Sequence, residues 1–115
     1  MAKTLAVPMF VLIFAVGAAL SAESDKLIEG ARKEGKMVFY TSVETEFARS
    51  LTVAFEAKYP FIKTDIFRST HERIFSRMNV ERQTGTYTAD VVSVGEFETY
   101  HMQKKGFIAP YKSPF

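Results

Sequence analysis

The sequence predicts an α/β fold in which helices cover both faces of a parallel sheet, giving three layers. Apolar runs at residues 37–42, 62–67 and 89–94 alternate with segments of helical periodicity, in the order α-β-α-β-α-β-α. The connections are short, as α/β units require, and right-handed crossovers then make the strands parallel. A hydrophobic fraction of 47% and a charged fraction of 24% are those of a globular domain, which excludes bulk disorder.

The first 22 residues are predicted to form a secretory signal peptide that is not part of this fold. Lys3 is followed by an apolar run over residues 5–20 and then by small residues. The run contains Pro8 and is shorter than the roughly 20 residues that span a bilayer, which argues against a retained membrane anchor. We therefore expect export, with only transient contact between the leader and a membrane, and a mature domain over residues 23–115.

The composition also excludes several kinds of function. The chain has no cysteine, so disulfides, thiolate catalysis and cysteine-ligated metals are all excluded. The formal net charge is +2, and cations are interleaved with acids, as in KLIEGARKEGK, a pattern typical of solvated helix surface. Because nucleic-acid binding needs a concentrated basic face, no nucleic-acid partner is expected.

The mature chain is expected to begin with a helix over residues 25–35 and a strand over residues 37–42. The helix ends at Gly35, which suits a C-terminal cap. Its apolar side chains share one face, and these are Leu27, Ile28 and Ala31. The strand, MVFYTS, is apolar at nearly every position, as in strands that are buried on both faces of a sheet.

A second helix is expected to take Thr45 as its N-cap and to end before Pro60. Its apolar side chains recur at helical spacing and form one inward face, composed of Phe47, Leu51, Ala54 and Phe55. The strand that follows, residues 62–67, alternates more in polarity and is placed nearer an edge of the sheet.

The third helix is predicted from a capping box, in which Ser69 caps the helix and Glu72 reaches back to the Ser69 amide. It stops near Gly85 and directs three side chains inward, Ile74, Phe75 and Met78. After the buried strand at residues 89–94, a fourth helix over residues 96–105 carries Phe97 and Tyr100 and stops at Gly106.

Polar residues follow each of the three predicted strands. In open parallel sheets, ligands gather at the carboxyl ends of the strands, where helix N-termini offer free N–H groups. The candidate ligand-binding residues at these junctions are Thr41, Ser42, Arg68, Ser69, Thr70, Gly95 and Glu96. The hydroxyls can add hydrogen bonds and Arg68 can hold a carboxylate or phosphate, so a small-anion site is expected.

Plainer roles are open for the same residues. Ser69 and Thr45 can serve only as helix caps, and Thr41 and Ser42 only as turn residues. Arg68 can be a solvated surface arginine, and an acid near a helix start is explained by the helix dipole alone. His71 and His101 lie on predicted helices without metal-ligand spacing, so they are expected at the surface.

Signatures of catalysis are missing from the sequence. It contains no G-x-G-x-x-G, G-x-x-x-x-G-K-[ST], G-x-S-x-G or H-E-x-x-H motif. The sequence therefore predicts a binding protein rather than an enzyme, with no cofactor.

Four segments together resemble a known family. EGKMVFYTSVE, AFEAKYPFIKTDIFR, TADVVSVGE and KKGFIAPYKSP, in this order, are similar to the amino-terminal part of bacterial extracellular solute-binding proteins. More narrowly, they resemble the iron(III)-transport-type branch of the periplasmic receptors that serve ABC importers. The resemblance implies a periplasmic location and a type II periplasmic-binding-protein fold with two lobes. Residues 23–115 would then form an incomplete first lobe of a truncated chain.

The resemblance also implies a class of ligand and partner. Family ligands include ferric ion, thiamine and phosphorus-containing organic anions, bound between the lobes and passed to the importer's membrane subunits. Thr41, Ser42, Ser69 and Thr70 match segments that line the family's cleft. Some ferric-binding members use a histidine after the first strand, whereas this chain has TSVETE there. Glu44 of this segment is the candidate metal ligand, and Glu96 after the third strand is the alternative.

Two other functions are compatible with the sequence. One is a small exported α/β domain that binds a protein partner through an apolar patch. The other is an exported hydrolase that uses Glu44 or Glu96.

Overall fold

The computed structural model describes residues 14–112, with side chains described from residue 24 onward. Most of the predicted signal peptide, residues 1–13, lies outside the described residues. Residues 14–22 belong to a helix, α1, which runs over Phe14–Glu34 and therefore starts well before the predicted residue 25. No helix in residues 14–112 is both long enough and apolar enough to cross a membrane.

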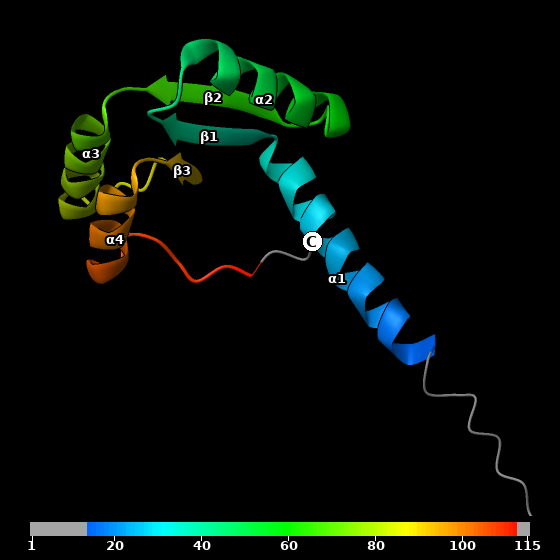
Figure 1. Ribbon diagram of the computed structural model, residues 1–115. Coiled ribbons are helices and arrows are strands. Elements are labelled where there is room, and N and C mark those ends of the chain that lie inside the picture. The colour runs from blue at the N-terminus through cyan, green and yellow to red at the C-terminus, as the bar shows by residue number, and fades with distance from the viewer. Residues whose placement is uncertain (1–13, 113–115) are drawn as a thin grey trace, which may run out of the picture. The chain divides into compact units, whose positions relative to one another are not determined.

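The chain divides after Glu34 into two compact units. The first contains α1. The second is an α/β unit with the order β1 (Lys36–Thr41), α2 (Thr45–Lys58), β2 (Lys63–Arg68), α3 (His71–Gln83), β3 (Val91–Ser93) and α4 (Glu96–Lys104) (Figure 1). The predicted alternation of helices and strands is confirmed.

The three strands form one parallel sheet in the order β2-β1-β3. Phe39 of β1 lies opposite Ile66 of β2 on one side and Val91 of β3 on the other. Successive residues of a strand point to opposite faces, so β1 supplies side chains to both. Phe39 lines a groove with residues of α2, whereas Tyr40 packs with α3 and α4. The predicted α/β class and parallel sheet are confirmed.

The main core lies on the α3 and α4 side of the sheet. Val38 and Tyr40 of β1 pack there with Ile74 of α3 and Met102 of α4, and all four are buried. Partly buried rings and aliphatic side chains complete this core, among them Phe67, Phe75, Met78 and Phe107. The predicted inward position of Ile74, Phe75 and Met78 is confirmed.

The predicted inward face of α2 is only partly correct, because Phe55 is half-buried and lines the groove with Phe39. Phe47 and Leu51 are 63% and 50% exposed, and the buried residues of the helix are Ala48 and Thr52. Small side chains at this four-residue spacing let the helix lie close to the sheet, which turns its larger apolar residues to the flank. The fourth helix behaves similarly, because Phe97 and Tyr100 are exposed while Met102 is buried.

Two predicted helix caps are displaced by one residue. The N-cap of α2 is Glu44 rather than Thr45, and the N-cap of α3 is Thr70 rather than Ser69. The Ser69 amide still donates to the Thr41 carbonyl oxygen, at 3.1 Å, so the strand pairing continues through Ser69 and the helix starts later. Thr70 Oγ1 then accepts the Arg73 amide at 3.4 Å.

The predicted third strand is shortened at its start by Asp90. The Asp90 carboxylate accepts the Val38 amide at 2.8 Å, and the Asp90 amide donates to the Val38 carbonyl oxygen at 3.0 Å. A side chain thus replaces a backbone carbonyl as the acceptor, and regular β3 pairing begins only at Val91. The predicted helix stops at Gly35, Gly85 and Gly106 are confirmed, and each of these glycines has a positive φ.

Replacing Ile74 by Ala should destabilise the α/β unit by about 2–5 kcal/mol, because the side chain is fully buried and the lost methyl groups leave a cavity. Chemical denaturation measures this loss. Val80→Ala is the matched control on the same helix, since Val80 is 56% exposed and should change stability by less than about 0.5 kcal/mol. Equal losses in the two variants would contradict the described packing of α3.

Candidate functional site

The strand order creates a switch point at the carboxyl edge of the sheet. The chain leaves β1 through α2 to reach β2, then crosses back through α3 to place β3 on the other side of β1. Ligands of open α/β sheets bind where the connections diverge in this way. The β1–α2 and β3–α4 junctions are therefore the candidate site, and Ser42 and Gly95 lie in them.

Backbone and hydroxyl hydrogen bonds join the two junctions. The Ser42 amide donates to the Ser93 carbonyl oxygen at 3.0 Å, and the Ser42 hydroxyl donates to the same oxygen at 3.3 Å. Thr41 is fully buried, and its Oγ1 accepts the Val43 amide at 3.1 Å. The buried Thr41 side chain thus fixes the shape of the loop, while Ser42 is half-buried beside β3.

His71 ties α3 to the β3–α4 junction. Its Nδ1 accepts the Gly95 amide at 2.9 Å, which requires this nitrogen to be unprotonated. His71 is half-buried, so the expected surface position is wrong. His101 is also half-buried, with its ring 4.4 Å from the Phe97 ring, centroid to centroid. The sequence signal for His71 was its position directly after the Ser-Thr pair that precedes α3.

Gly95 brings backbone close to two polar side chains. A Cβ atom at this position would lie 2.9 Å from Glu98 Oε2 and 3.4 Å from His71 Nδ1. Gly95 is the N-cap residue of α4, and no side-chain hydrogen bond caps this end. The junction therefore places half-buried backbone next to a carboxylate and an imidazole.

Arg68 does not belong to the same cluster as Ser42 and Gly95. Its Nε donates to the Val43 carbonyl oxygen at 2.8 Å, and its side chain lines a cavity between α2 and β2. The predicted site residues thus divide into two groups. Ser42 and Gly95 lie at the switch point, where Ser93 and His71 join them, while Arg68 lies on the side of β2 with Thr45 and Arg49.

The remaining predicted residues lie at helix starts. Glu44 is the N-cap of α2 and Glu96 is the first residue of α4, and both are exposed. Thr70 caps α3, and its hydroxyl hydrogen-bonds to the Glu72 carboxylate. The pKa of the Glu72 carboxyl is lowered, mainly by a hydrogen bond from Glu72's own backbone amide and secondly by the one from Thr70. Among residues 24–112, no three or more acidic or histidine side chains gather closely enough to hold a metal ion.

A second polar network, which the sequence did not indicate, lies in the core. The Tyr40 hydroxyl donates to Glu81 Oε1 at 2.6 Å, and Arg77 Nε donates to the same oxygen at 2.9 Å. The Arg77 guanidinium carbon lies 4.2 Å from the centroid of the Phe67 ring and 5.0 Å from that of Tyr40. This network fixes α3 against β1 and β2.

The network shifts the pKa values of its members. Burial, together with the bond to Glu81, raises the pKa of the Tyr40 hydroxyl. Burial would also raise the pKa of the Glu81 carboxyl, but the hydrogen bonds from Tyr40 and Arg77 outweigh it and the pKa is lowered. The hydrogen bond to Glu81 raises the pKa of the Arg77 guanidinium.

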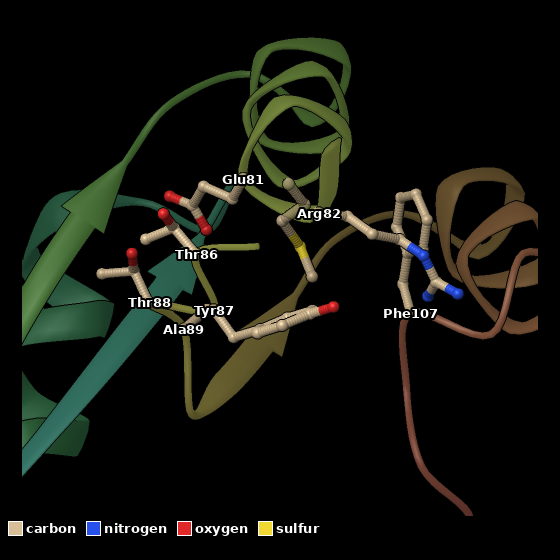
Figure 2. A pocket seen from close by; sticks show the side chains of 8 residues that line it. Glu81, Arg82, Thr86, Tyr87, Thr88, Ala89 and Phe107 are labelled. Carbon is tan, nitrogen blue, oxygen red and sulfur yellow. The ribbon is translucent and has the colours of Figure 1, made fainter. Parts of the chain in front are cut away.

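A small cavity adjoins this network (Figure 2). Its volume is about 50 Å³, enough for a few water molecules and far below the several hundred Å³ of ordinary ligand pockets. Figure 2 shows Glu81, Thr86 and Thr88 grouped on one side and Arg82 beside Phe107 on the other. Arg82 already donates to the Gly106 carbonyl oxygen at 2.6 Å, so this region joins α3 to the chain after α4.

No protein-family model matches this sequence, and a search of curated proteins finds no match.

Replacing Glu81 by Gln tests the core network. Because folding lowers the Glu81 pKa, its carboxylate stabilises the folded state above the ordinary glutamate pKa of about 4.3, and this contribution is lost as the pH falls through the folded-state pKa. E81Q should lower the free energy of unfolding by about 1–3 kcal/mol at neutral pH, and the stability of E81Q should fall less on acidification than that of the wild type. Denaturation at several pH values measures both. Glu46→Gln, at an exposed position, is the control, and an unchanged acid dependence in E81Q would contradict the assignment.

Replacing His71 by Ala should leave the Gly95 amide without its acceptor. We expect a loss of about 1 kcal/mol and faster hydrogen exchange at Gly95, because a broken hydrogen bond to partly buried backbone has this magnitude. Amide exchange followed by NMR locates the effect. Ser76→Ala, at an exposed position on the same helix, should leave Gly95 exchange unchanged. Unchanged Gly95 exchange in H71A would show that the histidine does not hold this junction.

Proposed function

We propose that this protein is the solute-binding component of an ABC import system, exported to the periplasm, and that its α/β unit is the start of the first lobe. On this proposal it binds its ligand without catalysis. The observation that carries the proposal is the switch point between β1 and β3, where Ser42, Ser93, Gly95 and His71 form a hydrogen-bonded junction at the carboxyl edge of the sheet.

The positions of the four family-like segments support this proposal. EGKMVFYTSVE contains β1 and the loop to α2, and AFEAKYPFIKTDIFR contains β2. TADVVSVGE contains β3 and the N-cap of α4, and KKGFIAPYKSP begins at Lys104, the last residue of α4. The resemblance therefore covers the three strands and the junctions after β1 and β3, which is where a ligand site of this fold is expected.

The chemistry of the junction favours a small anionic solute or a metal chelate. Backbone amides at the starts of α2 and α4 suit oxygen-rich anions. A bare ferric ion needs several hard oxygen ligands, and the exposed Glu44 is the candidate that this unit would contribute. The other ligands of the ion would come from a second lobe.

In the proposed receptor, affinity depends on enclosure. A ligand held between two lobes loses most of its contact with water, whereas a ligand on one edge of a sheet keeps it. The α/β unit alone is therefore expected to bind weakly, with its importer contacts completed only in the two-lobed protein.

A protein-binding domain is the second candidate function, because α2 presents apolar side chains to solvent. Phe47 and Val53 are each 63% exposed. Leu51 lines an apolar groove of about 250 Å³ whose other walls are Met37, Phe39, Thr52, Phe55 and Val91. In a two-lobed receptor the rest of the lobe would cover this groove; in the alternative a separate protein would.

Replacing Gly95 by Ala tests the proposed site. The full chain is titrated with ferric citrate, a phosphonate, thiamine and a simple carboxylate while the amide NMR signals of Ser42 and Gly95 are followed. One ligand class should shift these signals selectively. G95A should weaken that ligand by about tenfold, because the added methyl group and the displaced Glu98 carboxylate occupy the approach to the backbone.

Gly30→Ala is the matched control, since a Cβ there meets nothing within 4 Å. Undiminished binding in G95A, or no selective shift at Ser42 and Gly95 with any member of the panel, would count against a solute site at the switch point. Binding of a protein through Leu51 in the absence of such shifts would favour the second candidate.

A further inference from the structure

A second cavity lies between α2 and β2, on the opposite side of β1 from β3. It is lined by Thr45, Ala48 and Arg49 of α2 and by Ile66 and Arg68 of β2. Its volume is about 330 Å³, which falls in the range of pockets that bind small molecules. The hydrogen bonds that join Ser42 to Ser93 and His71 to Gly95 involve none of these five residues, although Arg68 bonds to the neighbouring Val43 carbonyl oxygen.

The two charged residues that line this cavity are both basic. Two guanidinium groups, those of Arg49 and Arg68, line it, and no acidic side chain does. In the described residues Arg49 makes no side-chain hydrogen bond or ion pair, although other basic side chains do, such as Arg77 with Glu81 and Lys33 with Glu29. Two like charges beside one cavity repel each other, and an anion between them would relieve this repulsion.

Arg68 is held in place before any ligand arrives. It ends β2 and its register partner in β1 is the buried Thr41. Its Nε donates to the Val43 carbonyl oxygen at 2.8 Å, which fixes the plane of the guanidinium and leaves its terminal N–H groups available. Arg49 approaches from a different element, one turn into α2, so the two cations can hold a ligand from two directions.

The rest of the lining suits an organic anion. Thr45 adds a hydroxyl group, while Ala48 and Ile66 provide an apolar surface between the cations. A planar guanidinium forms paired hydrogen bonds with phosphate and carboxylate oxygens. The start of α2 contributes potential of the same sign.

We infer that the cavity between α2 and β2 binds a small anion through Arg49 and Arg68, by its phosphate or carboxylate group. This site is separate from the switch point and does not depend on the solute-receptor function. In a protein that also binds a solute at the switch point, this cavity would be a second anion site next to the β1–α2 loop, because Arg68 bonds to that loop at Val43.

The experiment titrates the full chain with inorganic phosphate and with citrate, and follows amide and arginine side-chain NMR signals. Sodium chloride at matched ionic strength is the reference for screening. We expect saturable shifts at Thr45, Arg49, Ile66 and Arg68 that chloride does not produce. The anion that saturates at the lower concentration tells whether phosphate or carboxylate is preferred.

R49Q should weaken this binding by about tenfold or more, because a charge-assisted hydrogen bond is lost. Arg49 is exposed and makes no described side-chain contact, so R49Q is expected to fold as the wild type does. R73Q is the matched control, since Arg73 is an exposed arginine in the first turn of α3 and lies outside the cavity. It should bind both anions as the wild type does.

Shifts of equal size with chloride, equal weakening in R49Q and R73Q, or no saturable shift at these residues would each overturn the inference. Shifts confined to Ser42 and Gly95 would support the switch-point site and overturn this one. Shifts confined to Thr45, Arg49, Ile66 and Arg68 would support this site and leave the solute-receptor proposal without its own evidence.

Discussion

The α/β unit depends on the pairing of β1 with two strands at once. Every residue of β1 has a register partner in β2, and its last three residues also pair with β3. Because β1 is central, its side chains reach both faces of the sheet, and its carboxyl end is where both neighbouring strands finish. The core, the switch point and the cavity beside β2 are all arranged around this one strand.

The two faces of β1 are used differently. On the α3 and α4 side, Val38 and Tyr40 are buried in a closed core, and the Tyr40 hydroxyl is satisfied by Glu81. A buried hydroxyl without a partner would destabilise the fold, so the Glu81 carboxylate is part of the packing rather than a surface charge. On the α2 side, Phe39 lines an open apolar groove. The same strand thus contributes alternate side chains to a closed core on one face and to an open apolar groove on the other.

The sequence was sufficient to predict the strands and the fold class, because an apolar run of β-branched and aromatic residues such as MVFYT strongly favours a buried β-strand. It also indicated Ser42 and Gly95 correctly as residues of the carboxyl edge. The helix caps were misplaced for one reason: Ser69 keeps its backbone bond to β1, and pairing across strands is invisible in a local pattern. The inward face of α2 was only partly correct because apolar spacing cannot tell a large flank residue, such as Phe47, from a small contact residue, such as Ala48.

The distribution of the polar side chains was harder to predict. Arg68 is the last residue of β2 and Ser42 directly follows β1, so the sequence placed them together, yet the bond to Val43 turns Arg68 toward α2. His71 was overlooked because its partner, the Gly95 amide, is 24 residues away. Both outcomes follow from contacts between segments that are distant in sequence, which composition and periodicity do not contain.

The distance along the chain between β1 and β3 has a consequence for how the protein folds. The bond between Val38 and Asp90 closes a loop of 52 residues, whereas the bond between Val43 and Arg68 closes one of 25. Longer loops lose more chain entropy on closure, and contacts of high sequence separation slow folding. The pairing of β1 with β2 is therefore favoured to form first, and β3 to dock last. The junction of Ser42 with Ser93 would be the latest part of the sheet to assemble and the earliest to open when the protein unfolds.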